Sequence, residues 1–199
     1  MNSCILLAAG ESQRFGSPKA LATIDSQSVI ERLQRELLAT KLQRIVVVLG
    51  SARRAVEPFL LKHKKIKVVY NKDHNLGQTS SFKAGLKAAK ASANAFLLPV
   101  DYPFVKAGTI DALIERMERE TCEVLIPTYK TKRGHPPVFA ASLNAEILSW
   151  PDAVGLNELV HRHASGIREL SVDDAGVVSS FNTRAEFDAL LLDHSRSKD

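Results

Sequence analysis

The chain has 199 residues, of which 45% are hydrophobic and 25% charged, and its formal net charge is +5. This length and composition are typical of one globular domain and exclude a disordered chain. Basic residues gather at 62–67 without aromatic residues between them, and no apolar run approaches the ~20 residues of a membrane-spanning helix, so nucleic acid and membrane are excluded as expected partners.

Five short apolar runs indicate buried strands. They are residues 5–8, 44–49, 67–70, 95–98 and 123–126. Between them lie segments with apolar residues at helical spacing. These expected helices are residues 28–38, 52–61, 80–91 and 109–120. Because continuous apolar runs are typical of strands buried on both faces, the alternation predicts an α/β fold: a single-domain, Rossmann-like, mostly parallel sheet with helices on both faces.

After Pro127 the alternation gives way to shorter elements. A short helix is expected near Ser142 and another at 158–163, followed by strand-like pieces at 167–172 and 176–179.

The carboxyl-terminal segment begins with a last helix. Asn182 or Thr183 can cap it, because either side-chain oxygen can accept a backbone N–H. We expect one domain over residues 1–193 and a charged, frayed tail at 194–199.

The loop after the first strand carries the strongest functional signal. Residues 7–19 read Leu-Ala-Ala-Gly-Glu-Ser-Gln-Arg-Phe-Gly-Ser-Pro-Lys. The loop leaves the carboxyl end of a strand, where open α/β sheets bind ligands. Small residues at 8–10 let a nucleotide approach the backbone, whose free N–H groups can surround a triphosphate. Arg14 and Lys19 supply the positive charge that phosphoryl transfer needs; the alternative is a plain Gly/Ser loop with two solvated cations.

Other common signals are absent from the sequence. No Gly-x-Gly-x-x-Gly follows the first strand and no Gly-x-x-x-x-Gly-Lys-[Ser/Thr] occurs, which disfavours a Rossmann dehydrogenase and a P-loop NTPase. The apolar run at the amino terminus is too short for a signal peptide and follows no basic residue. We therefore expect a cytoplasmic protein.

Two further positions are argued from the residues themselves. Asp101 follows the strand at 95–98, at the same sheet edge as the first loop, so its carboxylate can hold Mg²⁺ against phosphate oxygens. The alternative is a turn aspartate ahead of Pro103. Ser80 and Ser81 open a helix, whose amino-terminal end favours anions, and simple capping is the alternative there.

Four motifs occur in order along the chain. They are Leu-Ala-Ala-Gly-x-Ser-x-Arg-Phe-Gly-x-x-Lys at 7–19, Gly-Gln-Thr-Ser-Ser at 77–81, Pro-Val-Asp-Tyr-Pro at 99–103 and Arg-Gly-His-Pro at 133–136. This set resembles the MobA-like NTP transferase family, and most closely its molybdenum cofactor cytidylyltransferases (MocA-like). The resemblance covers nearly the whole chain and implies the nucleotide-diphospho-sugar transferase type of fold and a Mg²⁺-dependent nucleotidyltransferase.

The resemblance implies a role for each motif. Arg14, Lys19 and Asp101 are the expected catalytic residues, with Asp101 also a ligand of Mg²⁺. Gly134 and His135 are the expected acceptor-binding residues. The expected nucleotide-binding residues are Leu7, Ala8, Ala9, Gly10, Ser12, Gln78, Ser80 and Ser81.

The family's carboxyl-terminal metal-binding segment has two aspartates that this chain lacks. The corresponding residues 180–186 read Ser-Phe-Asn-Thr-Arg-Ala-Glu. We predict Asn182 as the second metal ligand, since an amide oxygen can ligate Mg²⁺, although the site then has one negative charge fewer. A plain helix cap is the alternative.

The expected reaction is attack of an acceptor phosphate on the α-phosphorus of an NTP, with release of pyrophosphate. CTP is favoured, because the related guanylyltransferases carry a second glycine where Ala9 stands, and molybdopterin is the favoured acceptor. The alternatives are a guanylyltransferase of the same cofactor, a sugar- or polyol-phosphate nucleotidyltransferase, and a low-turnover protein that binds and delivers the nucleotide or cofactor. The resemblance also implies a transient contact with a molybdoenzyme or its chaperone.

Overall fold

The computed structural model describes residues 1–196. Its eight-stranded main sheet has the order β10-β7-β9-β6-β1-β4-β5, with β8 paired to β7. The strands of this sheet are β1 (Asn2–Ala8), β4 (Arg44–Leu49), β5 (Ile66–Tyr70), β6 (Asn94–Pro99), β7 (Val124–Tyr129), β8 (Lys132–Arg133), β9 (Val138–Phe139) and β10 (Ile167–Ser171). A separate hairpin joins β2 (Thr23–Ile24) and β3 (Gln27–Ser28). All five strands predicted from the apolar runs lie in the main sheet.

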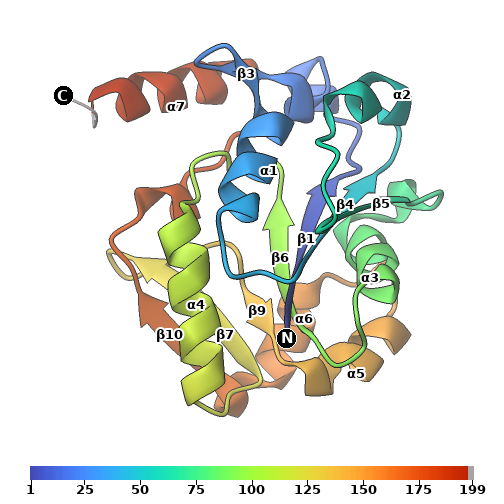
Figure 1. Cartoon of the computed structure of the whole chain (residues 1–199), viewed down its shortest axis with the longest axis vertical. Coiled ribbons are helices and arrows are strands. Elements are labelled where there is room, and N and C mark those ends of the chain that lie inside the picture. Colours follow the sequence, from blue (N-terminus) through green and yellow to red (C-terminus); the bar gives the residue numbers. More distant parts are fainter. Residues whose placement is uncertain (197–199) are drawn as a thin grey trace.

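The sheet is mostly parallel, as predicted. β1 pairs in parallel with β4 on one side and β6 on the other, β4 pairs with β5, and β7 pairs with β10. The two-residue strand β9 is antiparallel to both β6 and β7, and β8 is antiparallel to β7. The carboxyl ends of β1, β4 and β6 therefore meet at one edge of the sheet (Figure 1).

Helices cover both faces of the sheet. They are α1 (Val29–Leu38), α2 (Arg53–Val56), α3 (Gln78–Ala88), α4 (Ala107–Arg119), α5 (Asn144–Ser149), α6 (Leu156–Arg162) and α7 (Arg184–Arg196). Shorter 3₁₀ helices are η1 (Gln13–Phe15), η2 (Lys19–Leu21), η3 (Glu57–Phe59), η4 (His74–Leu76), η5 (Ala141–Leu143), η6 (Ala164–Gly166) and η7 (Ala175–Val178).

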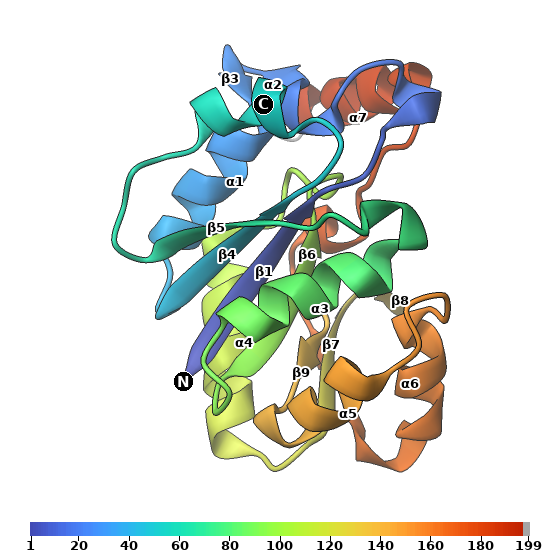
Figure 2. The same ribbon diagram turned by 90° about the vertical axis from the view of Figure 1, so that its right-hand side faces the viewer.

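Alternate residues of β1 form two separate cores. Cys4 and Leu6 pack among residues of α1 and α4, whereas Ile5 and Leu7 pack among residues of α3, α5 and α6. Figure 2 shows the second set of helices in front of the sheet and α1 and α4 behind it. This burial on both faces explains the continuous apolar run of residues 5–8 in β1.

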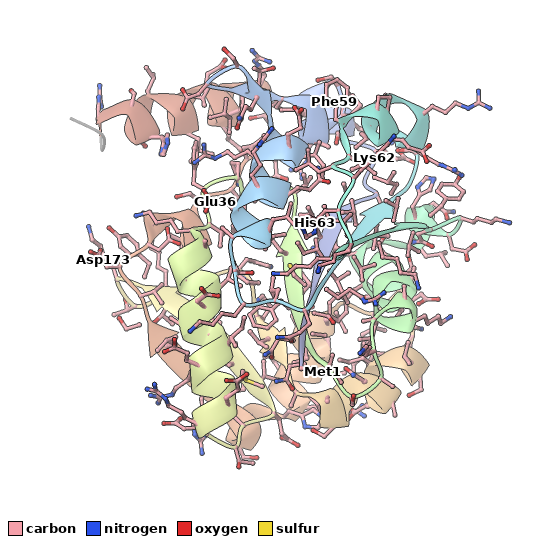
Figure 3. The ribbon with its side chains drawn as sticks, viewed as in Figure 1. Met1, Glu36, Phe59, Lys62, His63 and Asp173 are labelled. Atoms are coloured by element: carbon pink, nitrogen blue, oxygen red, sulfur yellow. The ribbon has the colours of Figure 1, made fainter. Side chains whose placement is uncertain are left out.

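Side chains fix the first turns of α1 and α4. Ser28 and Glu31 form a capping box at the start of α1. The carboxylate of Glu36, on α1 (Figure 3), accepts the backbone N–H of Ala107 at 3.0 Å and so joins the first turn of α4 to α1.

The strand predicted at 176–179 is wrong, because residues 176–178 belong to η7 and Ser179 follows its end. The buried carboxylate of Asp174 accepts the backbone N–H groups of Gly176 and Lys106 and the hydroxyl of Thr109. These bonds fold the segment over the start of α4 instead of letting it extend along the sheet.

The helix predicted at 52–61 is interrupted. Only α2 is α-helical, and η3 follows it at once, with Pro58 near its start. Proline lacks the N–H that a continuing α-helix needs.

The frayed tail predicted at 194–199 is wrong for residues 194–196, which belong to α7. The ring of His194 stacks on that of Phe104, with centroids 3.9 Å apart, and this contact holds the last turn against the domain. Residues 197–199 lie outside the described residues. Within residues 1–196, no helix combines the length and apolar character needed to cross a membrane.

Candidate active site

A cleft of about 500 Å³ lies where β1 and β6 end. Parallel neighbours bring their carboxyl ends together, so the loop after β1 and the segment after β6 share this edge, although they are far apart in sequence. Most residues predicted for the site line the cleft. They are Leu7, Ala8, Ala9, Gly10, Ser12, Arg14, Lys19, Gln78, Ser81, Asp101 and Asn182.

The loop after β1 is shaped by Ser12. Its backbone is left-handed, with φ of 55°, and its carbonyl accepts the N–H groups of Phe15 and Gly16. Its hydroxyl oxygen accepts the backbone N–H of Lys19 at 3.1 Å. Ser12 therefore holds Lys19 at the start of η2, and its own side chain also borders the cleft.

An aromatic cluster fastens this loop to the carboxyl-terminal segment. The ring of Phe15 lies 5.2 Å from that of Phe181 and 5.7 Å from that of Phe187, measured between centroids. All three rings are buried. The residue after Phe181, Asn182, is thereby placed beside the first loop.

Lys19 joins the three segments of the site. Its ammonium group donates hydrogen bonds of 2.9 Å to the carboxylate of Asp101 and 2.9 Å to the amide oxygen of Asn182. Arg14 donates to the same amide oxygen at 3.2 Å. The side chains of Lys19 and Asp101 are only 13% and 21% exposed, so water screens their attraction less than at an open surface.

The side chain of Asn182 does not cap α7. Thr183 does so: its hydroxyl oxygen accepts the N–H of Glu186 at 3.2 Å. In return, the carboxylate of Glu186 accepts the N–H groups of Thr183 and Asn182. These backbone bonds lower the pKa of Glu186, with a smaller contribution from Arg14 and Lys19. The amide oxygen of Asn182 is thus turned toward the cations of the cleft.

The donor atoms near Asp101 fit a divalent cation. One carboxylate oxygen of Asp101 bonds Lys19, and the other is buried without a hydrogen-bond partner. An oxygen in this condition is stabilised by a cation or donor that a ligand brings. Within residues 1–196, no group of three or more His, Cys, Asp or Glu side chains could hold a metal ion. The candidate oxygen donors are therefore the carboxylate of Asp101 and the amide of Asn182, whose oxygen also accepts hydrogen bonds from Lys19 and Arg14.

The amino-terminal end of α3 forms another wall of the cleft. Gly77 precedes it with φ of 103°, a conformation that favours glycine, and Gln78 and Ser81 border the cleft. Ser80 does not line it. Its hydroxyl bonds the carbonyls of Asp73 and Gly77, which ties down the turn before the helix. The structure therefore gives Ser80 a structural contact in place of the predicted position in the cleft.

The two residues predicted for the acceptor lie beside the cleft and do not line it. Gly134 packs against Val177, whose carbonyl oxygen would lie 2.3 Å from a Cβ at this position. The ring of His135 lies on that of Tyr102, with centroids 4.3 Å apart, and so reaches the neighbour of Asp101. Burial lowers the pKa of His135 to about 4, against the opposing charge of Asp101, so its imidazole is neutral at pH 7.

Sequence reasoning missed Gly50, which lies against the first loop, and two residues that line the cleft. Gly50 follows β4, and a Cβ there would lie 2.2 Å from the carbonyl oxygen of Ala9, so only glycine allows the two loops to touch. A glycine directly after the clearest predicted strand is the signal that could have found it. Ala52 and His74 line the cleft, and Nδ1 of His74 is buried without a hydrogen-bond partner. No periodicity or motif in the sequence marked these two.

The basic stretch at 62–67 has no part in this site. Lys62 and His63 lie in the segment between η3 and β5 (Figure 3), and no residue of the stretch lines the cleft.

The first loop can surround phosphates, and two cations and a carboxylate lie beside it at one edge of a parallel sheet. Together with the family match, this arrangement defines an enzyme of the nucleotidyltransferase class. Comparison with known families identifies the family within this class. The MobA-like NTP transferase domain matches residues 4–167, and the chain belongs to this family.

Relatives carry more than one activity in their names. The nicotine blue oxidoreductase of Paenarthrobacter nicotinovorans is 29% identical over 73% of this chain and 74% of its own length. The probable molybdenum cofactor guanylyltransferase of Bacillus cereus (strain G9842) is 28% identical over 70% of this chain and 67% of its own. The molybdenum cofactor cytidylyltransferase of Escherichia coli K12 is 22% identical over 92% of both chains.

Solved structures share the fold. Rv0371c from Mycobacterium tuberculosis H37Rv superposes with a TM-score of 0.82 at 26% identity, over 96% of this chain and 98% of that one. A complex of Rv0371C with manganese has a TM-score of 0.77 at 24% identity, over 96% and 97%. The expected fold type is thereby confirmed.

Proposed function

We propose that the protein transfers a nucleoside monophosphate, CMP from CTP in the favoured case, to a phosphorylated acceptor of the molybdopterin type, with release of pyrophosphate. The observation that carries the proposal is the meeting of Lys19, Asp101 and Asn182 in the lining of one cleft. The names of the Escherichia coli and Bacillus cereus relatives support the acceptor. We assign the reaction to the cytoplasm.

In the proposed reaction, an oxygen of the acceptor phosphate forms a bond to the α-phosphorus of the NTP. The bond from that phosphorus to the oxygen bridging the β-phosphate breaks, and pyrophosphate leaves with that oxygen. A phosphate acceptor is already ionised near neutral pH, so the step needs no strong general base. It needs positive charge where negative charge spreads over the phosphate oxygens.

Arg14 and Lys19 supply that fixed charge in the proposal. Lys19 is held from both ends, because Ser12 bonds its backbone while Asp101 and Asn182 bond its ammonium group. Asp101 and Asn182 are the proposed ligands of Mg²⁺, which when bound neutralises and orients phosphate oxygens.

The nucleoside is proposed to lie along the first loop and the start of α3. Leu7, Ala8, Ala9 and Gly10 form one side, and Gln78 and Ser81 the other. The preference for CTP over GTP rests on Ala9, where the related guanylyltransferases carry a second glycine. One relative is named a cytidylyltransferase and another a guanylyltransferase, so a measurement must decide which NTP this protein prefers.

The acceptor is proposed to approach from the side of Gly134 and His135. The contact between His135 and Tyr102 supports this side, because Tyr102 directly follows Asp101. A neutral imidazole there can exchange a hydrogen bond with the acceptor without adding charge. Delivery of the product by transient contact with a molybdoenzyme or its chaperone is part of the same proposal.

The test measures pyrophosphate release with each of the four NTPs, molybdopterin and Mg²⁺, beside the thermal shift that each NTP causes. The highest kcat/KM is expected with CTP. Preference for GTP would reassign the base. Release with a sugar phosphate or polyol phosphate, and none with molybdopterin, would replace the acceptor.

Two observations favour other candidates. The 29% identity with nicotine blue oxidoreductase makes an oxidoreductase the second candidate. The single carboxylate at the proposed metal site favours a low-turnover carrier. Reduction of nicotine blue by NADH or NADPH, without pyrophosphate release, would support the oxidoreductase. Tight NTP binding with neither activity would support the carrier.

A further inference from the structure

Glu186 makes one contact that helix capping does not explain. It stands at the third position of α7, and with Thr183 it forms the reciprocal pair of a capping box. Such a box accounts for the bond from the N–H of Thr183 to the carboxylate. The same carboxylate oxygen also accepts the N–H of Asn182, which precedes the cap.

Asn182 therefore lies between two anchors. On one side, the N–H of Phe181 donates to the backbone carbonyl of Asp101 at 3.3 Å, and the Phe181 ring is buried. On the other side, the N–H of Asn182 itself donates to Glu186. The side chain of Asn182 is left to accept hydrogen bonds from Lys19 and Arg14.

We propose that Glu186 is a positioning residue of the proposed metal site: it fixes the backbone of Asn182 so that the amide oxygen stays beside Asp101 and Lys19. This inference rests on the proposed function, in which Asn182 holds the metal. Only the oxygen of the Asn182 amide can bind a cation, whereas its NH₂ group is a donor, so the direction in which the amide points decides whether it can ligate. Groups that hold a metal ligand in place commonly change metal affinity when they are removed.

The chain offers matched variants that separate positioning from capping and from charge. Glu186→Ala removes the bonds to both N–H groups. Glu186→Gln keeps an oxygen that can accept them but has no charge. Thr183→Val removes the hydroxyl that caps α7 and leaves the carboxylate free to hold Asn182.

The experiment measures the affinity of a CTP analogue with a methylene group between its α- and β-phosphates, by calorimetry, once with Mn²⁺ and once with EDTA. The ratio gives the gain in affinity that the metal provides, without turnover. Glu186→Ala is expected to reduce this gain at least about 10-fold and to leave the affinity in EDTA unchanged. Glu186→Gln and Thr183→Val are expected to keep the gain.

Three results would overturn the inference: an unchanged gain in Glu186→Ala, an equal loss in Thr183→Val, or an equal loss in Glu186→Gln. The first denies any role, the second reduces it to capping, and the third assigns it to charge.

A second readout needs no nucleotide. The side-chain amide resonance of Asn182 in a ¹⁵N spectrum is expected to move in Glu186→Ala and to stay in place in Thr183→Val. If the wild type binds none of the four NTPs, the proposed function fails, whereas this resonance still decides whether Glu186 positions Asn182. An unchanged resonance in Glu186→Ala would overturn the inference about Glu186 and leave the proposed function standing.

Discussion

The ammonium group of Lys19 lies 2.9 Å from the carboxylate of Asp101, which stands 82 positions further along the chain. Neither residue reaches the other through local structure, because one follows β1 and the other follows β6. Their meeting depends on the parallel pairing of these two strands. The proposed chemistry depends on it in turn.

Removing the charge of Lys19 is expected to disable turnover. Lys19→Met keeps the length of the side chain but cannot stabilise charge on the triphosphate, so we expect a loss of at least about 2.7 kcal/mol in transition-state stabilisation, or roughly 100-fold in kcat/KM. The control is Lys41→Met, which breaks a similar 2.8 Å ion pair with Glu115 at the surface. Equal activity in the two variants would remove Lys19 from the catalytic set.

A carboxylate at position 182 is expected to strengthen the metal site. Asn182→Asp adds a negative charge beside the buried, unpartnered oxygen of Asp101, and Mg²⁺ prefers charged oxygen ligands. The added attraction is worth roughly 1 kcal/mol, so the concentration of Mg²⁺ that gives half-maximal activity should fall several-fold. A half-maximal concentration equal to that of the wild type would show that this side chain does not contact the metal.

The contact between Gly50 and the first loop predicts a sensitive position. A Cβ at Gly50 would meet the carbonyl of Ala9 at 2.2 Å, so Gly50→Ala must separate the two loops and should cost about 1–3 kcal/mol of stability. NTP affinity should fall with it. Gly108→Ala is the control, because nothing lies within 4 Å of the added methyl in α4. Thermal denaturation that ranks the two variants alike would contradict the contact.

The bonds of His163 should contribute a part of the free energy of unfolding that is lost as the pH rises. Its ring nitrogens bond the carboxylates of Glu123 at 3.0 Å and Glu146 at 2.8 Å. Partial burial opposes the charge, but these bonds prevail and raise the pKa of His163 above 6.5. The stabilisation is full below pH 6.5 and disappears as the pH rises through the higher folded value. Urea denaturation of wild type and His163→Gln should differ most at pH 6, and a pH-independent difference would refute the charged bridge.

His135 predicts the opposite trend. Burial lowers its pKa from 6.5 to about 4, so the unfolded chain binds a proton in this range that the folded chain does not. Its contribution to stability therefore decreases as the pH falls from 6.5 toward 4. NMR titration of the His135 ring should show no protonation between pH 8 and pH 5.5. A midpoint near 6.5 would place this ring in water.

Local patterns predicted much of the fold and part of the site. The apolar runs predicted all five long parallel strands between residues 2 and 129, and the loop motif predicted that Arg14 and Lys19 would share a cleft with Asp101. The helix predicted at 52–61 overlooked a local residue, Pro58. The other two errors lie where a distant residue decides the local conformation. Asp174 turns residues 175–178 into a 3₁₀ helix through its bonds to Lys106 and Thr109, and Phe104 holds the last turn of α7.

The sequence by itself determined the elements and the chemical groups, because periodicity, capping and motif spacing act over a few residues. Only the tertiary structure decided that Ser80 bonds its own turn, that Asn182 faces Lys19 and leaves capping to Thr183, and that Gly50 admits the first loop. These outcomes depend on which surfaces the packed sheet and helices bring together, and contacts between residues far apart in the chain leave no local pattern to read.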